Sequence, residues 1–147
     1  MAERLKLRAL DGEDLAVVSA CLQDAAVPLS EITYLPSERR FAFVASRFRW
    51  ENNGAGSGAP DAVQERINCG VVFDRVTRAR TRHVDLSDRG QTFDLLAVEI
   101  RDGDIVLVLG GDGEVRLEVE RIVCHLQDIG EPWPTQWRPG HPETDGD

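Results

Sequence analysis

Three arginines spaced two residues apart are the side chains of this sequence best suited to bind an anion. Arg78, Arg80 and Arg82 project from one face if this stretch is an extended strand, because successive side chains of a strand point to opposite sides. Arg47 and Arg49 repeat the spacing on an aromatic segment and are candidates for the same face. Guanidinium groups gathered on one sheet face bind a carboxylate, a phosphate or an acidic protein surface through paired hydrogen bonds.

The same arginine spacing is also typical of a strand face that is simply solvated. In that interpretation the guanidinium groups pair with acidic side chains on neighbouring strands, for which Glu99, Glu118 and Glu120 are candidates. The sequence leaves both interpretations open, because it does not show which strands are neighbours.

Two tryptophans in a proline-rich stretch are the second candidate for binding. Trp133 and Trp137 lie in residues 131–147, which we interpret as a tail that follows a single β-rich domain of residues 1–130 and ends in disorder. A tryptophan on such a segment either docks on its own domain or provides an anchor for a partner. Both possibilities remain open at this stage.

The histidines and cysteines predict neither a catalytic site nor a metal site. They are His83, His125, His141, Cys21, Cys69 and Cys124. None has a partner at the short spacings that zinc ligands need, and no nucleotide-binding or hydrolytic motif occurs. The three cysteines form no CxxC pair, so we expect reduced, buried thiols in a cytoplasmic protein. We therefore predict no catalytic residue, no cofactor and no metal.

The overall charge of the chain is acidic. At 147 residues the length fits one domain with a sizeable core, and the net charge of −9 opposes non-specific binding to nucleic acid or anionic membranes. No run approaches the roughly 18 apolar residues of a membrane helix, and no signal peptide is visible, so we expect no membrane insertion. The charge is uneven, since residues 39–89 hold ten of the sixteen arginines. That segment is the one able to attract an acidic partner locally.

The clearest structural pattern is a series of short apolar strands between residues 93 and 129. Residues 95–100 and 105–109 are short, mostly apolar stretches, and apolar and polar residues alternate in residues 115–119. Asp-Gly and Gly-Gly pairs separate these stretches, and such pairs are typical of hairpin turns. Residues 118–128 fit either a strand or a helix, and the alternation at their start favours the strand.

Further elements follow from similar patterns. Asp11 is a good N-cap for a helix over residues 12–23, and residues 52–60 are rich in glycine and predict a flexible loop. We expect additional strands over residues 5–9, 27–35, 41–50 and 66–76. Alternation predicts a core that contains Phe41, Phe43, Val72, Leu96, Val98, Val106, Val108, Leu117 and Val119.

Together these elements predict an α+β fold that is mainly antiparallel β. We expect a single barrel or roll of about seven strands with one N-terminal helix. A pleckstrin-homology-like barrel is one specific form of this fold. Its C-terminal helix would require the helical interpretation of residues 118–128.

Two groups of stretches resemble a known family. The first is residues 14–25 (DLAVVSACLQDA), followed by residues 34–36 and 40–42. The second is residues 73–76 (FDRV), 95–98 (LLAV) and 111–120 (GDGEVRLEVE). Over about residues 5–139 the chain resembles the domain-of-unknown-function family numbered 2948, an alphaproteobacterial family. The resemblance implies a bacterial cytoplasmic protein, and it assigns no activity and no residue role.

The sequence therefore predicts a non-catalytic binding or adaptor module that uses the arginine-bearing face or the C-terminal tail. Its partner would be a protein or a small anionic ligand. The alternative is a small-molecule-binding β-barrel, including an enzymatic one. A deep pocket with a strongly perturbed titratable group would favour that alternative, whereas a filled core with an exposed arginine patch would favour the binding module.

Overall fold

The fold combines one helix with a large antiparallel sheet, as given by a computed structural model that describes residues 4–49 and 64–135. The strands are β1 (Lys6–Ala9), β2 (Ala25–Pro28), β3 (Ile32–Leu35), β4 (Arg40–Phe48), β5 (Gln64–Phe73), β6 (Val76–Arg82), β7 (Thr92–Arg101), β8 (Asp104–Leu109), β9 (Glu114–Val119) and β10 (Cys124–Thr135). The helix of this described part is α1 (Gly12–Cys21), and short 3-10 helices occupy η1 (Leu29–Glu31), η2 (Pro36–Glu38) and η3 (Gly110–Asp112). The predicted loop over residues 52–60 lies outside the described residues.

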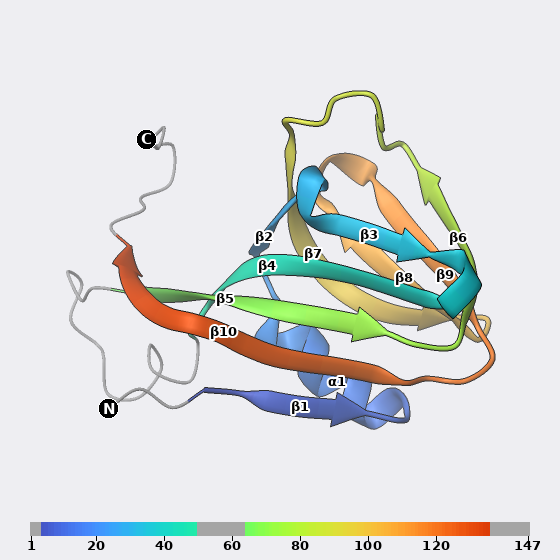
Figure 1. The fold of residues 1–147 in the computed structure, drawn as a ribbon, viewed down its shortest axis with the longest axis horizontal. Helices are drawn as coiled ribbons and strands as arrows, with labels where there is room; N and C mark the ends of the chain where they lie inside the picture. The colour runs from blue at the N-terminus through green and yellow to red at the C-terminus, as the bar shows by residue number, and fades with distance from the viewer. Residues whose placement is uncertain (1–3, 50–63, 136–147) are drawn as a thin grey trace.

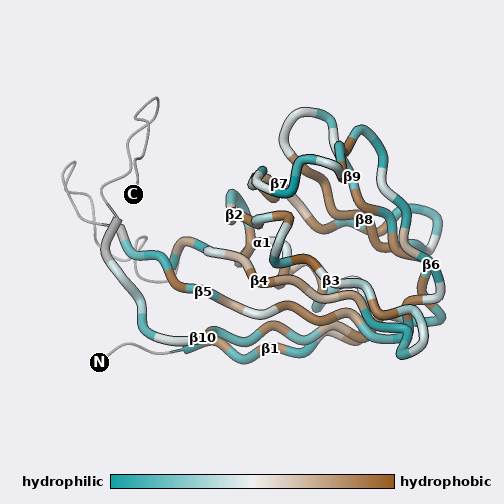
Figure 2. Tube along the Cα trace, turned by 45° about the horizontal axis from the view of Figure 1, so that its top comes forward, coloured by the Kyte–Doolittle hydropathy of each residue, from teal (hydrophilic) through white to brown (hydrophobic). Residues whose placement is uncertain are grey.

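The sheet is folded into two layers. Its strand order is β1-β10-β5-β4-β2-β7-β8-β9-β6, and β3 pairs with β4 beside this path. Figure 1 shows β1, β10, β5, β4 and β3 side by side, with β7, β8 and β9 in a second layer above and behind them. Apolar residues follow the strands of both layers, as the brown stretches of Figure 2 show. The core therefore lies between two parts of one continuous sheet.

The helix α1 lies against the core at one side of the two-layered sheet. Asp11 caps it as predicted, since its carboxylate accepts a hydrogen bond of 2.8 Å from the Asp14 N–H. The helix packs against β1 and β7, and its Leu15 and Val18 are buried in the core. Its observed end at Cys21 is two residues before the predicted one.

Of the predicted barrel or roll, the closed barrel is wrong, because the sheet stays open. Closure would require its two end strands, β1 and β6, to pair with each other. Instead, β6 meets the other layer near its first residue, where the Val76 N–H donates to the Arg39 carbonyl at 2.9 Å. The sheet also has ten strands rather than about seven. One reason is that the predicted strand over residues 27–35 is divided by η1, so that β2 pairs with β7 and β3 with β4.

Most of the predicted core residues are confirmed. Phe41, Phe43, Val98, Val106 and Leu117 are buried. The remaining half-buried members are Val72, Val108 and Val119. The predicted face is the core face on β4 and β9. On β5 and β8 the core cluster instead contains the neighbours of the predicted residues, which are Val71, Phe73, Ile105, Leu107 and Leu109.

The prediction that Leu96 lies in the core is wrong. Its side chain is 43% exposed, whereas Leu95 is buried. The register of β7 against β8 shifts between Leu95 and Ala97. This irregularity changes which residue faces inward. The Val98 N–H next to it donates to the Ser19 hydroxyl of α1 at 2.9 Å.

Residues 118–128 are strand and turn, as the alternation favours. Strand β9 ends at Val119, and β10 begins at Cys124. The C-terminal helix required by a pleckstrin-homology-like barrel is therefore not formed by this segment.

Strand β10 extends into the proline-rich stretch that the sequence predicts as a tail. It pairs with β5 as far as Thr135, with a shift in register between Ile129 and Trp133. Pairing with β1 on its other side ends at Gln127, so Pro132 lies where β10 forms an edge of the sheet. Proline is tolerated there because an edge position does not need every backbone N–H for pairing.

Candidate functional site

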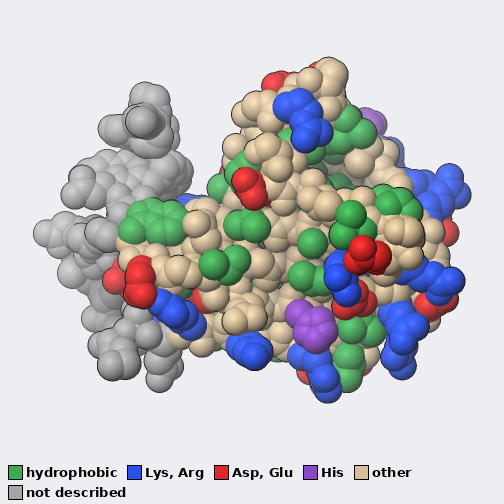
Figure 3. All heavy atoms as spheres, viewed as in Figure 1, with side chains coloured by type: hydrophobic (Ala, Val, Ile, Leu, Met, Phe, Trp, Pro, Cys, Tyr) green, Lys and Arg blue, Asp and Glu red, His purple; other side chains and the backbone are tan. Residues whose placement is uncertain are grey.

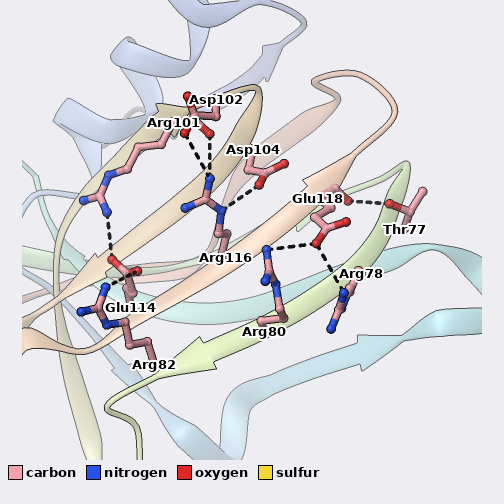
Figure 4. A network of polar contacts seen from close by, with 10 residues as sticks. All are labelled: Thr77, Arg78, Arg80, Arg82, Arg101, Asp102, Asp104, Glu114, Arg116 and Glu118. Atoms are coloured by element: carbon pink, nitrogen blue, oxygen red, sulfur yellow. Dashed lines mark hydrogen bonds and ion pairs between the residues drawn. The ribbon is translucent and has the colours of Figure 1, made fainter.

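Strand β6 carries the predicted row of arginines on its outer face. Arg78, Arg80 and Arg82 alternate with Ala79, which is half-buried, and their side chains are 64%, 46% and 70% exposed. The structure thus confirms that period-two spacing brings these three guanidinium groups onto one exposed face (Figure 4). We call Arg78, Arg80 and Arg82 the arginine row.

Two carboxylates of β9 lie among these three guanidinium groups. In the register of β6 with β9, Glu118 is opposite Arg78 and Glu114 is opposite Arg82. Glu118 lies 3.0 Å from Arg80 but 3.9 Å from Arg78, and Glu114 lies 4.0 Å from Arg82. The two outer arginines are therefore exposed and are held only by long ion pairs.

A second set of arginines holds the acidic groups of this face more closely (Figure 4). Arg101 hydrogen-bonds to Glu99 and Glu114, at 3.0 and 2.9 Å, and these bonds raise its pKa. Arg116 hydrogen-bonds to Asp104 at 2.7 Å, which raises the pKa of Arg116 as well. Because Arg101 engages Glu114 at the shorter distance, this carboxylate neutralises the arginine row only in part.

Of the acidic residues expected to face the arginine row, two pair elsewhere. Glu99 pairs with Arg101 on its own strand, at 2.9 Å. Glu120 lies 2.6 Å from Arg39 and 3.8 Å from Arg75, at the corner where β5 turns into β6. Of the three acidic residues expected to pair with the arginine row, Glu118 does so, whereas Glu99 and Glu120 do not.

Arg47 and Arg49 do not join the arginine row, and the expectation that they share its face is wrong. Both are buried, with exposed fractions of 0% and 2%. Arg47 follows Phe43 and Ala45 in the inward-facing row of β4, so period-two spacing here directs a guanidinium into the interior. Arg49 pairs with Glu65 at 2.5 Å.

The buried Arg47 forms a two-pronged pair with Asp128 of β10. Its Nε and NH2 donate to the two Asp128 oxygens at 2.9 and 2.7 Å, and its NH1 donates to the Phe48 carbonyl at 2.9 Å. Asp128 also accepts a hydrogen bond of 2.8 Å from the Leu5 N–H. This pair ties β4 to β10 across β5 and holds the residue that precedes β1. Its role is structural.

The sequence contains a signal for this pair that the spacing of the arginines alone does not reveal. Asp128 continues the inward alternation of Cys124 and Leu126, just as Arg47 continues that of Phe43. A charged residue at an inward position on each of two strands predicts a buried ion pair, since a buried charge is stable only with a partner.

Of the two predicted tryptophans, the structure describes one. Trp133 lies in β10 opposite Arg66 and is 38% exposed. Trp137 lies outside the described residues. Trp133 is thus neither fully docked in the core nor presented on a free segment.

Two of the three cysteines occupy positions that oppose nucleophilic chemistry. Cys69 and Cys124 are buried as expected, and burial raises the pKa of both to about 12, whereas Cys21 is only half-buried. A thiol acts as a nucleophile through its thiolate, which such a pKa disfavours. In the described part of the chain, no three His, Cys, Asp or Glu side chains are grouped so as to hold a metal ion.

We predict that Cys69 and Cys124 resist alkylation in the native protein. At pH 8 a thiol with a pKa of about 12 is thiolate in about one molecule in 10⁴, and burial also excludes the reagent. Iodoacetamide labelling followed by peptide mass spectrometry should show both peptides unmodified until denaturant is added. Rapid labelling of either residue in the folded protein would contradict the pKa argument.

Comparisons with known proteins add a family but no relative of known role. Among residues 4–49 and 64–135, no helix is long and apolar enough to cross a membrane. A comparison with curated proteins and one with solved structures each give no match. A family pattern described as "Protein of unknown function (DUF2948)" matches residues 5–141, which is nearly the whole sequence. Its strands, its helix and its arginine row are therefore those of a member of the DUF2948 family, to which this chain belongs.

Proposed function

We propose that this chain is a non-catalytic cytoplasmic binding module whose arginine row binds an acidic, extended segment of a partner protein. The observation that supports this proposal is the imbalance of charge on the outer face of β6. Three exposed guanidinium groups share two carboxylates, and one of these carboxylates, Glu114, is held more closely by Arg101. Arg78 and Arg82 are therefore available to a further carboxylate.

Replacing the carboxylates that now pair with Arg78 and Arg82 by carboxylates of a ligand costs little free energy. Exposed ion pairs contribute roughly 0–1 kcal/mol, and the pairs of Arg78 and Arg82 are long, at 3.9 and 4.0 Å. A ligand carboxylate that accepts two hydrogen bonds from one guanidinium forms the stronger contact. The net charge of −9 repels acidic molecules at long range, so the attraction is confined to this face.

Because β6 lies at the end of the sheet, its outer edge suits a partner segment that is itself extended. β6 pairs with β9 on one side and ends the strand order. An extended peptide can add to such an edge through its backbone. Residues two apart on a strand are about 6.6–6.8 Å apart, so acidic side chains at alternate positions of the peptide would match the spacing of the arginine row.

We expect the double variant Arg78→Ala/Arg82→Ala to bind an acidic strand-forming peptide about tenfold more weakly than the wild type. Each lost contact is worth about 0.5–1 kcal/mol, and two of them amount to roughly one decade in Kd. The probe is a fluorescent peptide of alternating glutamate and valine, measured by anisotropy at low and at physiological salt. Binding should weaken as salt rises, because exposed charges are screened beyond about 8 Å at physiological ionic strength.

Two controls make this test specific. Arg8→Ala/Arg121→Ala removes the same charge from another part of the surface and should leave peptide binding unchanged. A peptide with glutamine in place of glutamate should bind neither the wild type nor either double variant. Equal loss in both double variants would show that only net charge matters, and binding of the glutamine peptide would show that the arginine row has no role.

A further inference from the structure

A surface hollow lies where β1 ends and the turn into β10 begins. Its volume is about 290 Å³, and it is lined by Arg8, Leu10, Arg121, Ile122, Val123 and His125. Arg8 and His125 are opposite each other in the register of β1 with β10, and the turn before β10 contributes the other wall. Figure 3, which has the view of Figure 1, shows basic side chains along the side of the molecule formed by β1 and β10.

The cationic side chains of this hollow differ from those of the arginine row, because they lack acidic partners. No Asp or Glu lines the hollow. Within residues 4–49 and 64–135, Arg8 and Arg121 make no ion pair, whereas each arginine of the arginine row has one. Two guanidinium groups and an imidazole therefore border one space with no neutralising carboxylate in its wall.

We propose that this hollow binds a small phosphate monoester that carries an apolar group. Two guanidinium groups with an imidazole offer more donors than one carboxylate can use, and planar guanidinium groups match the oxygens of a phosphate. The rest of the lining is apolar and consists of Leu10, which is half-exposed, with Ile122 and Val123. The volume is at the lower end of the range for small-molecule sites, so the ligand is small.

An adjoining hollow does not serve as the anion site. It has a volume of about 360 Å³ and shares Arg121 and Val123 with the first. Carboxylates offset its other arginines, because Glu38 and Asp74 line this hollow and Arg39 lies 2.6 Å from Glu120. The anion is therefore placed between Arg8 and Arg121, with the apolar group of the ligand against Leu10, Ile122 and Val123 of the first hollow.

The test of the proposal uses phenyl phosphate, followed by the backbone amide shifts of the ¹⁵N-labelled protein. Phenyl phosphate should shift the amides of Leu10, Ile122 and Val123. Arg8→Ala/Arg121→Ala should weaken its binding at least tenfold. Arg78→Ala/Arg82→Ala, which removes the same charge from the arginine row, should bind phenyl phosphate like the wild type.

Because each double variant is the control of the other, failure of this proposal and failure of the arginine-row proposal are distinguishable. Benzoate and inorganic phosphate serve as comparison ligands, and both should bind more weakly than phenyl phosphate. Equal binding of benzoate would overturn the choice of phosphate, and equal binding of inorganic phosphate would overturn the role of the apolar wall. If Arg8→Ala/Arg121→Ala does not fold, Leu10→Glu at this exposed position should abolish binding by charge repulsion. Undiminished binding in that variant, or no amide shifts in the wild type, would reject the site.

Discussion

Replacing Asp128 by alanine should lower the free energy of unfolding by about 3–5 kcal/mol, because it leaves a buried charge without its partner. The guanidinium of Arg47 is fully buried, and two of its hydrogen bonds end on the Asp128 carboxylate, at 2.9 and 2.7 Å. The variant also removes the acceptor of the Leu5 N–H. Urea denaturation followed by circular dichroism measures the change.

Two further variants separate the buried charge from other causes. Glu131→Ala removes a carboxylate from the same strand, in an exposed pair with Arg4, and should cost less than about 1 kcal/mol. Arg47→Met/Asp128→Leu removes both buried charges and should be more stable than Asp128→Ala alone, because it leaves no buried charge without a partner. If Asp128→Ala and Glu131→Ala have the same denaturation midpoint, the Arg47–Asp128 pair does not stabilise the fold as argued.

Leu117→Ala should lower the free energy of unfolding by about 2–5 kcal/mol, through lost burial and the cavity that remains. Leu117 is fully buried on β9, opposite Ala79 of β6 and Ile105 of β8. Strand β9 is the link between β6 and the rest of its layer, so a defect here also loosens the arginine row. The shift in the urea midpoint is the measurement.

The matched control is the same substitution at the leucine that the structure places outside. Leu96 is 43% exposed, so Leu96→Ala should cost less than about 1 kcal/mol. Equal costs at the two positions would contradict the assignment of Leu117 to the core and of Leu96 to the surface.

Local sequence patterns are sufficient to predict those elements whose residues interact with near neighbours in the chain. The hairpin of β7 and β8 follows from Asp102 and Gly103, which adopt the positive φ values, 52° and 84°, that its tight turn requires. The helix follows from its capping residue, and the common face of Arg78, Arg80 and Arg82 follows from the alternation of β6. Each of these depends on backbone geometry over a few residues.

The same alternation fails for Arg47 and Arg49, and the reason is physical. A period of two shows that residues share a face of a strand, but it does not show whether that face meets water or the core. For Arg47 the decision depends on Asp128, which lies 81 residues further along the chain and supplies the opposite charge only in the folded protein. Leu96 fails for a related reason, because a register shift against β8 is a property of the pair of strands.

The sequence by itself therefore determined the mainly antiparallel β class, the helix, the hairpin of β7 and β8, part of the core, the shared face of the arginine row and the family. Only the tertiary structure decided that the sheet stays open, with β1 and β6 as its end strands. It also brought together the Arg47–Asp128 pair and the hollow between Arg8 and Arg121. These features join residues from distant segments, and their free energies arise only after the intervening strands have paired and ordered the chain, so no local pattern records them.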